Sequence, residues 1–177
     1  MAFQNIGAAA KRVKAVFQRR PEVGISDDAP AKARWESGTR VLIRHTNGIE
    51  VATDMPVELG GSGDQVTPGW LFRAGIASCA ATSITLAAAS DGIELTALEV
   101  IVASRSDARG LLGMSEPNGE PVYAGPFDVE LRVSLAANGV TPIALKTLVE
   151  RCLCHSPVPS ALITATPFTL RINIESQ

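Results

Sequence analysis

A long, nearly uncharged stretch from Thr67 to Gly92 constrains the fold of this chain more than any other feature. Thr67 is a good helix N-cap, Pro68 suits the first helical position, and Gly92 can take the left-handed conformation that ends helices. Between these ends, small and apolar residues recur at helical spacing, and only Arg73 and Asp91 carry a charge. The stretch is richer in Gly, Ser and Thr than a typical membrane-spanning helix. We therefore predict one long helix that is enclosed at the centre of the fold.

The composition of the chain is that of an ordinary globular protein. Its 177 residues suit one domain with a small additional arm, 46% of them are hydrophobic, and the net charge is -2. This balance gives no support to nucleic-acid binding, because phosphate recognition needs an excess of Lys and Arg. The three cysteines are an odd number and do not suggest a disulfide framework, which indicates a reducing compartment. The N-terminus lacks the basic-then-apolar order of a secretory signal, so we expect a cytoplasmic protein.

The chain divides into an N-terminal helical arm with its linker, residues 1–33, and a main domain, residues 34–177. Residues 2–19 place apolar side chains near one side of a helix and basic side chains towards the other. Such a helix can lie on a membrane surface, or it can pack as an arm on the body of the protein or on a partner subunit. The short apolar face favours the packed arm. Pro21 ends the helix and opens the linker.

The main domain alternates between strand and helix patterns. Asn47-Gly48 is a strong hairpin signal between two β-branched runs. The pair Thr141-Pro142 repeats the cap-plus-proline start of a helix, and this second helix stops near His155 because a Ser-Pro pair follows. In order, the pattern predicts a hairpin at 39–45 and 49–53, the central helix, strands at 95–104 and 127–135, the second helix, and a closing strand at 167–175. This order predicts an α+β fold with antiparallel strands.

Cys79, in the middle of the long helix, is the sharpest candidate for chemistry. A cysteine reacts as the thiolate, which needs a nearby cation or hydrogen-bond donors and access to solvent. The alternative is a small hydrophobic residue of the core. Cys152, Cys154 and His155 form a second cluster at the end of the second helix. Their CxCH spacing is not a usual zinc pattern, so we expect no metal and no cofactor, whereas one of these cysteines could face Cys79 as a disulfide partner.

Four segments of the chain carry a resemblance to a known protein family. They are DMPVELGG at 54–61, TPGWLFRAGIASC at 67–79, GIELTALEV at 92–100 and HSPVPSAL at 155–162. In order and spacing they are similar to the OsmC/Ohr family of hydroperoxide-resistance proteins, and the similarity covers residues from about 39 to 174. The resemblance implies an OsmC-like fold, in which a long central helix is wrapped by antiparallel sheets. It also implies an intertwined homodimer with two active sites at the subunit interface.

The resemblance further implies roles for individual residues. In the family, a peroxidatic cysteine on the central helix attacks a hydroperoxide, and a resolving cysteine after the second helix closes a disulfide with it. Cys79 matches the peroxidatic position, whereas Ser156 stands where the resolving cysteine is expected. Arg40 is the nearest match to the family's active-site arginine, with Arg34 as the alternative. Gly69 stands where the accompanying glutamate is expected, so two of the four catalytic positions depart from the pattern.

These departures lead us to expect the family's activity in a weakened or altered form. The resemblance implies a thiol-dependent reductase of organic hydroperoxides in oxidative-stress defence. Because a serine cannot form the disulfide, either Cys154 or Cys152 takes over the resolving role, or an external thiol or dithiol reduces the oxidised Cys79. The alternative is a non-enzymatic homodimer that binds a small apolar ligand and has lost the redox cycle. We expect neither a nucleic-acid partner nor a membrane role.

Overall fold

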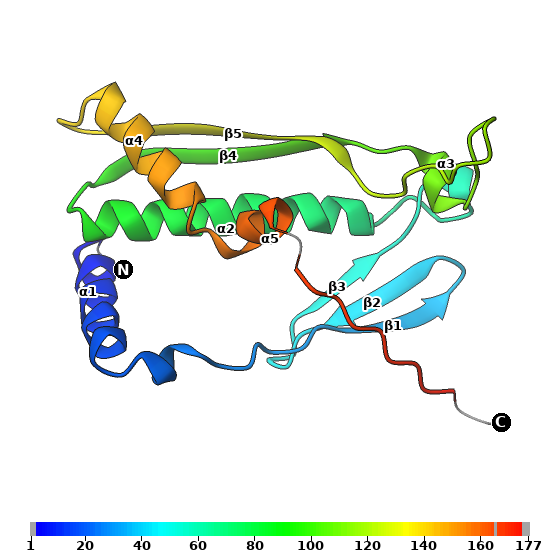
Figure 1. The fold of residues 1–177 in the computed structure, drawn as a ribbon, viewed down its shortest axis with the longest axis horizontal. Coiled ribbons are helices and arrows are strands. Elements are labelled where there is room, and N and C mark those ends of the chain that lie inside the picture. The colour runs from blue at the N-terminus through cyan, green and yellow to red at the C-terminus, as the bar shows by residue number, and fades with distance from the viewer. Residues whose placement is uncertain (1–2, 165, 175–177) are drawn as a thin grey trace.

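The computed structural model describes residues 3–164 and 166–174 of the chain (Figure 1). Helices and strands alternate along most of it, which confirms the predicted α+β class. In chain order the elements are α1 (Phe3–Arg19), the 3₁₀ helix η1 (Pro21–Gly24), β1 (Lys32–Ser37), β2 (Arg40–Arg44), β3 (Glu50–Thr53), the 3₁₀ helix η2 (Val57–Leu59), α2 (Pro68–Ser90), β4 (Leu95–Arg105), α3 (Ala108–Leu111), β5 (Phe127–Ala137), α4 (Pro142–Leu153) and α5 (Pro157–Ile163).

The long helix α2 runs through the middle of the molecule, and it begins and ends as its sequence predicts (Figure 1). The Thr67 hydroxyl accepts a hydrogen bond from the backbone N–H of Trp70 at 3.2 Å, which satisfies a free amide at the helix start. Gly92, just beyond the C-cap residue Asp91, has a φ of 73°, a value that glycine adopts without strain. Local signals therefore fix both ends of α2.

Two antiparallel sheets lie on different sides of α2 (Figure 1). Strands β1, β2 and β3 form one sheet in that order, and the 11-residue strands β4 and β5 form a two-stranded ribbon. On one face of this ribbon, Leu98 pairs with Leu135 and packs against the core. The other face carries polar pairs such as Glu99 with Ser134. The ribbon is thus half-buried, as the alternation of apolar and polar residues predicts.

The hydrophobic core lies between α2, α4 and the β4–β5 ribbon, and it is small. Ile84 and Ala88 of α2 pack with Leu148 and Cys152 of α4, and all four side chains are at most 4% exposed. Partly buried apolar side chains from β4 and β5 close the cluster from the ribbon side. One side of α2 is therefore enclosed by its own chain.

The opposite side of α2 is open in the single chain. The exposed residues Gly75, Ser78, Thr82 and Leu86 follow one stripe at helical spacing. The prediction of an enclosed helix is therefore wrong for this side of a lone chain, because among the described elements only α1 lies over the stripe, beside Leu86. By length and composition α2 could cross a membrane, but it packs against α1, β4, α4 and α5, as the central helix of a folded domain does.

The structure also adds elements that the sequence did not predict. Residues 32–37, at the boundary of the predicted linker and main domain, form β1, which pairs with β2 and carries a hydrogen bond from Trp35 Nε1 to the backbone oxygen of Gly38 at 2.9 Å. The short helices α3 and α5 lie in stretches for which the sequence pattern predicted no helix or strand. Each is a single turn or two, too short to show a periodic apolar pattern.

The predicted closing strand at 167–175 is wrong for the single chain. Residues 166–174 belong to no strand and run away from α5 past the β1–β3 sheet in this view (Figure 1), and residue 175 lies outside the described residues. A strand needs a neighbour that supplies hydrogen-bond partners, and no described strand of this chain pairs with the segment. The alternating apolar side chains of the segment are 71% to 90% exposed: Phe168, Leu170, Ile172 and Ile174.

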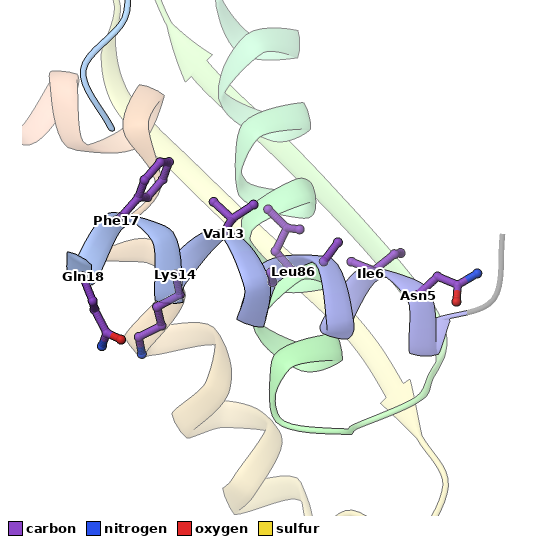
Figure 2. Close-up of a pocket in the computed structure, with 9 residues that line it drawn as sticks. Asn5, Ile6, Val13, Lys14, Phe17, Gln18 and Leu86 are labelled. Atoms are coloured by element: carbon purple, nitrogen blue, oxygen red, sulfur yellow. The ribbon is translucent and has the colours of Figure 1, made fainter. Parts of the chain in front are cut away.

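The N-terminal helix α1 packs across the C-terminal end of α2 (Figures 1 and 2). Gly7 permits the contact, because a Cβ atom at this position would lie 2.3 Å from the carbonyl oxygen of Ala89. Val13 and Phe17 of α1 and Leu86 of α2 line an apolar groove of about 780 Å³ between the two helices (Figure 2). These three side chains remain 43% to 48% exposed. The N-terminal arm is therefore packed on α2, and the groove between α1 and α2 is open to solvent.

Candidate functional site

The thiol of Cys79 and the hydroxyl of Ser156 meet between α2 and α5. Cys79 lies in the middle of α2 and is half-buried, and Ser156 is completely buried. The Cys79 Sγ atom lies 3.3 Å from Ser156 Oγ, and the backbone N–H of Val158 donates a hydrogen bond to the same sulfur at 3.4 Å. The fold thus brings together two predicted site residues that are 77 positions apart in the sequence.

The turn between α4 and α5 places Ser156 and Val158 at the sulfur. Helix α4 ends at Leu153, and α5 begins at Pro157, which occupies the first helical position. The Ser156 hydroxyl does not cap α5, although this residue stands at the N-cap. It accepts instead a hydrogen bond from Ser83 Oγ on α2 at 3.1 Å. The turn therefore aims the Ser156 side chain at α2 and not at its own helix.

Among the described residues, neither of the other two cysteines forms a disulfide or a hydrogen bond with Cys79. Cys152 is 4% exposed in the core, and burial raises the pKa of its thiol. Cys154 is exposed, and its thiol donates to the backbone oxygen of Glu150 at 3.5 Å. All three cysteines are free thiols. Over the described residues, no three His, Cys, Asp or Glu side chains gather where a metal ion could bind.

Arg40 is held by carboxylates near the loop that follows β3. Its guanidinium pairs with Asp54 at 3.4 Å and with Asp64, and it donates a hydrogen bond to Ser62 Oγ at 2.8 Å. The two carboxylates raise the pKa of Arg40, and Asp64 has the larger effect. Within the described part of the chain, Arg40 makes no hydrogen bond to Cys79. In a single chain, this predicted site residue therefore belongs to a different cluster from the thiol.

Two further predicted positions bring no charge to the thiol. Arg34 forms an exposed ion pair with Glu36 at 3.1 Å. Gly69 lies in the first turn of α2 and has no side chain, so no carboxylate extends from the position where the resemblance predicts a glutamate. The polar groups at the Cys79 sulfur are therefore a hydroxyl and a backbone amide rather than a cation.

Sequence reasoning missed Asp54, the buried charge beside Arg40. This side chain is 4% exposed and accepts hydrogen bonds from the hydroxyl of Ser62 at 2.6 Å and its backbone N–H at 3.1 Å. The Thr39 hydroxyl and the Met55 backbone N–H, the latter at 2.8 Å, also donate to it. These hydrogen bonds hold the pKa of Asp54 well below its usual range, and the bonds from the Ser62 and Thr39 hydroxyls have the largest effect. The available signal was its place at the head of the segment DMPVELGG.

An apolar cavity of about 600 Å³ lies between α2, α5 and β5, and its lining includes residues close in sequence to Cys79 and Val158 but not Cys79 itself. Ile76, which lines the cavity, lies one helical turn before Cys79 on α2. Pro159, which also lines it, directly follows Val158 on α5. Other lining residues are Phe72, Tyr123, Val129, Leu131, Leu153 and Leu162. A cavity with this lining suits an apolar molecule.

Comparison with known proteins gives one family match and many structural matches. A family model described as OsmC-like protein matches residues 61–171. Comparison with curated protein sequences gives no match. An OsmC-like protein from Mycoplasma pneumoniae is 13% identical to this chain, and the match covers 80% of this chain and 91% of that chain with a TM-score of 0.65. An organic hydroperoxide resistance protein OsmC from Legionella pneumophila is 24% identical and covers 78% and 90%, with a TM-score of 0.54.

A third solved structure, described as an organic hydroperoxide resistance protein from Vibrio cholerae, has a molecule of captopril bound in one of its active sites. It is 21% identical, covers 78% of this chain and 87% of that chain, and has a TM-score of 0.52. At such identities the solved structures show the fold, which is an OsmC-like α+β fold with a long central helix packed against antiparallel sheets. The family match spans more than half of the sequence and includes Cys79 and Ser156. The chain therefore belongs to the OsmC-like protein family.

Proposed function

We propose that this OsmC-like protein is a thiol-dependent reductase of organic hydroperoxides, with Cys79 as its one reactive cysteine. The contact at the sulfur carries the proposal, because a half-buried thiol receives a hydrogen bond from the Val158 amide and lies against the Ser156 hydroxyl. Hydrogen bonds to the charged form favour the thiolate, which is the nucleophile. The name of the Legionella pneumophila relative, an organic hydroperoxide resistance protein, supports the same class of reaction.

In the first step, the Cys79 thiolate attacks the terminal oxygen of the hydroperoxide. A sulfur–oxygen bond forms and the oxygen–oxygen bond breaks, so Cys79 becomes a sulfenic acid. The organic part leaves as an alkoxide and takes up a proton to give the alcohol. The hydroperoxide gains two electrons, and the sulfur loses them. The Val158 amide and the Ser156 hydroxyl stabilise the thiolate before the attack.

The return to the thiol needs a reductant from outside the chain. Ser156 cannot form a disulfide, and Cys152 is enclosed in the core. The Cys154 thiol is exposed and donates a hydrogen bond to a backbone oxygen of α4. An external thiol attacks the sulfenic acid, which releases water and leaves a mixed disulfide on Cys79. A second external thiol, or the other thiol of a dithiol, then attacks this disulfide and frees the Cys79 thiol. The proposed cycle therefore uses one cysteine of the chain.

The apolar cavity between α2, α5 and β5 supports an organic substrate. Its apolar lining, which includes Phe72 and Ile76, can hold the hydrocarbon part of a hydroperoxide next to Cys79. Hydrogen peroxide has no such part and gains nothing from the cavity. We therefore expect bulky organic hydroperoxides to react faster than hydrogen peroxide.

A homodimer is the second part of the proposal. The single chain exposes 13252 Å² of surface, whereas a compact monomer of 18.6 kDa exposes about 8,200 Å². This excess of about 5,000 Å² per chain is more than enough for an obligate dimer interface, in which the two partners together bury about 2,000–5,000 Å² or more. Three features are open to solvent: the exposed stripe of small residues and Leu86 on α2, the apolar groove between α1 and Leu86, and the unpaired segment 166–174 with its apolar side chains. A second copy of the chain can cover all three.

A non-enzymatic binding protein is the alternative. Two observations favour it, because Arg40 is occupied by Asp54 and Asp64, and Gly69 supplies no carboxylate. In this alternative, the cavity beside Ile76 holds a small apolar ligand and Cys79 stays reduced. The captopril bound in an active site of the Vibrio cholerae relative shows that a site in this fold can hold a small molecule.

Consumption of cumene hydroperoxide by the purified protein, with dithiothreitol as the reductant, distinguishes the two functions. We expect the wild-type protein and Cys154→Ser to consume it at the same rate, well above dithiothreitol alone. Cys79→Ser is expected to give only the background rate. Equal rates for wild type and Cys79→Ser contradict the enzyme. Binding of cumyl alcohol by calorimetry without any turnover would instead support the binding protein.

A further inference from the structure

We infer that Ser83 is a positioning residue for the Cys79 thiol: its hydroxyl holds Ser156 so that the Ser156 proton points at the sulfur. The inference rests on the proposed function, since it concerns the same thiol. It adds a residue of α2 that belongs to none of the family's four catalytic positions. It also explains how this site can activate a thiol with a hydroxyl where the family has a second cysteine.

The three side chains form one chain of contacts. Ser83 lies four positions after Cys79 on α2, so both side chains project from the same face of the helix. Ser83 Oγ donates to Ser156 Oγ at 3.1 Å, and Ser156 Oγ lies 3.3 Å from Cys79 Sγ. The Ser156 hydroxyl has no solvent exposure, so its hydrogen-bond partners are protein groups.

The role of Ser83 follows from the number of hydrogen bonds that the Ser156 hydroxyl can donate and accept. A hydroxyl has one proton to donate and can accept two hydrogen bonds. A neutral Cys79 thiol can donate to Ser156, but the thiolate can only accept, so the Ser156 proton must turn to the sulfur when Cys79 ionises. Because Ser83 donates to Ser156, it occupies an acceptor site there and leaves that proton free for the sulfur.

Hydrogen bonds fix the backbone of Ser156. The hydrogen bond from Ser83 therefore acts on the rotation of the Ser156 hydroxyl group. The Ser156 N–H donates to the carbonyl of Leu153 at 3.3 Å, and the Ser156 carbonyl accepts from the N–H of Ser160 at 2.9 Å. With the Val158 amide, the oriented hydroxyl gives the Cys79 thiolate two donors. Two donors can stabilise a thiolate in place of the arginine that is absent from the described contacts of the sulfur.

Three titratable side chains besides Cys79 lie near Ser83. Ser83 borders a small cavity of about 290 Å³ that is also lined by Arg151, Cys152 and His155. Arg151 is paired with Asp91, and Cys152 is buried. His155 is exposed and stands next to Ser156 in the chain. A change at Ser83 that keeps these groups in place therefore acts on the sulfur through Ser156.

Alkylation of Cys79 by iodoacetamide, followed peptide by peptide with mass spectrometry across a range of pH, tests the inference. For Ser83→Ala we expect the midpoint of the Cys79 alkylation profile to move to higher pH. The rate at pH 7 should fall about three- to tenfold, the effect of losing one ordinary hydrogen bond, here the one from Ser83 that orients the Ser156 hydroxyl. Ser83→Thr keeps the hydroxyl and should keep the wild-type profile. Cys154 in the same digest serves as the internal reference, because its contacts lie on α4.

Ser90→Ala is the matched control. Ser90 lies on the same helix, but its hydroxyl donates to the backbone oxygen of Leu86 at 2.8 Å and not to the site. This variant should leave the Cys79 profile unchanged. Alanine favours helix more than serine does, so we expect Ser83→Ala to fold, which its thermal melt checks.

A double variant shows whether Ser83 acts through Ser156. Ser156→Ala alone should shift the Cys79 profile at least as far as Ser83→Ala, and adding Ser83→Ala to it should cause no further shift. The inference is overturned if Ser83→Ala has the wild-type profile, or if its effect persists without the Ser156 hydroxyl. Alkylation needs no hydroperoxide, so this result is independent of whether the protein turns over cumene hydroperoxide.

Discussion

The chemistry that residue 156 can perform beside the Cys79 sulfur depends on whether its side chain is a serine hydroxyl or a cysteine thiol. The observed serine can donate a hydrogen bond to the thiolate, but it cannot take part in a disulfide. Its oxygen lies 3.3 Å from Cys79 Sγ, which is contact distance. A single atom therefore separates a site that closes an internal disulfide from one that depends on an external thiol.

Ser156→Cys should restore the internal disulfide. The new sulfur would stand in contact with Cys79, so a sulfenic acid formed there is attacked by its neighbour before an external thiol arrives. After one equivalent of cumene hydroperoxide, mass spectrometry of the unreduced digest should show Cys79 linked to the introduced thiol in the variant and no link in the wild type. Ser160→Cys, a half-buried position one turn further along α5, is the control and should stay free. Two free thiols in Ser156→Cys would contradict the geometry.

Among the elements, those fixed by local signals could be predicted, and those that depend on partners could not. The ends of α2 follow from Thr67, Pro68 and Gly92, each of which acts within its own turn. The segment 166–174 has a clear strand alternation but no neighbour in its own chain, so its pattern misled the prediction. The contact of Cys79 with Ser156 was implied by the family resemblance, because no spacing in the sequence could reveal an approach over 77 positions.

The loop after β3 should loosen in acid because of Asp54. Its pKa is depressed in the folded protein, so the charged form stabilises the fold fully at neutral pH. This stabilisation is lost as the pH falls below about 4, the value of an unfolded aspartate, towards the lower folded value. Asp54→Asn should melt at a lower temperature than the wild type at pH 7 and should lose less on acidification. Parallel pH dependence in the two proteins would show that Asp54 does not stabilise the loop.

The packing of α1 on α2 should depend on Gly7. In Gly7→Val the added side chain meets the carbonyl of Ala89, so α1 must move away. Limited trypsin digestion should then cut faster at Lys11 and Lys14, which lie within α1. Ala8→Val places the same side chain at the neighbouring exposed position and should digest like the wild type. Equal digestion of the two variants would mean that α1 does not need this close approach.

The whole molecule has more surface than a monomer of its size should expose. The open stripe of α2 and the groove beside Leu86 are continuous along one side of that helix. A partner that packs along α2 would also enclose the cavity region near Cys79 and could bring further side chains to it. The single chain therefore holds the thiol and its hydrogen-bond donors, and the second copy is expected to complete the enclosure.

Sedimentation equilibrium should give twice the chain mass of 18.6 kDa for the wild type. Leu86→Arg places a charge in the proposed interface and should raise the dimer dissociation constant at least about tenfold, which corresponds to ~1.4 kcal/mol. Ile143→Arg, at a position that is 79% exposed on α4, is the control and should sediment as the wild type does. A wild-type chain that sediments as a monomer would contradict the dimer.

The central claim is that Cys79 alone is oxidised by an organic hydroperoxide and waits for an external thiol. It is tested most directly by adding one equivalent of cumene hydroperoxide to the reduced protein in the presence of dimedone, which traps sulfenic acids. Mass spectrometry should find the dimedone adduct on Cys79, with Cys152 and Cys154 still reduced. An adduct that is missing from Cys79, or a disulfide that joins Cys79 to either of the other two cysteines, would contradict the account.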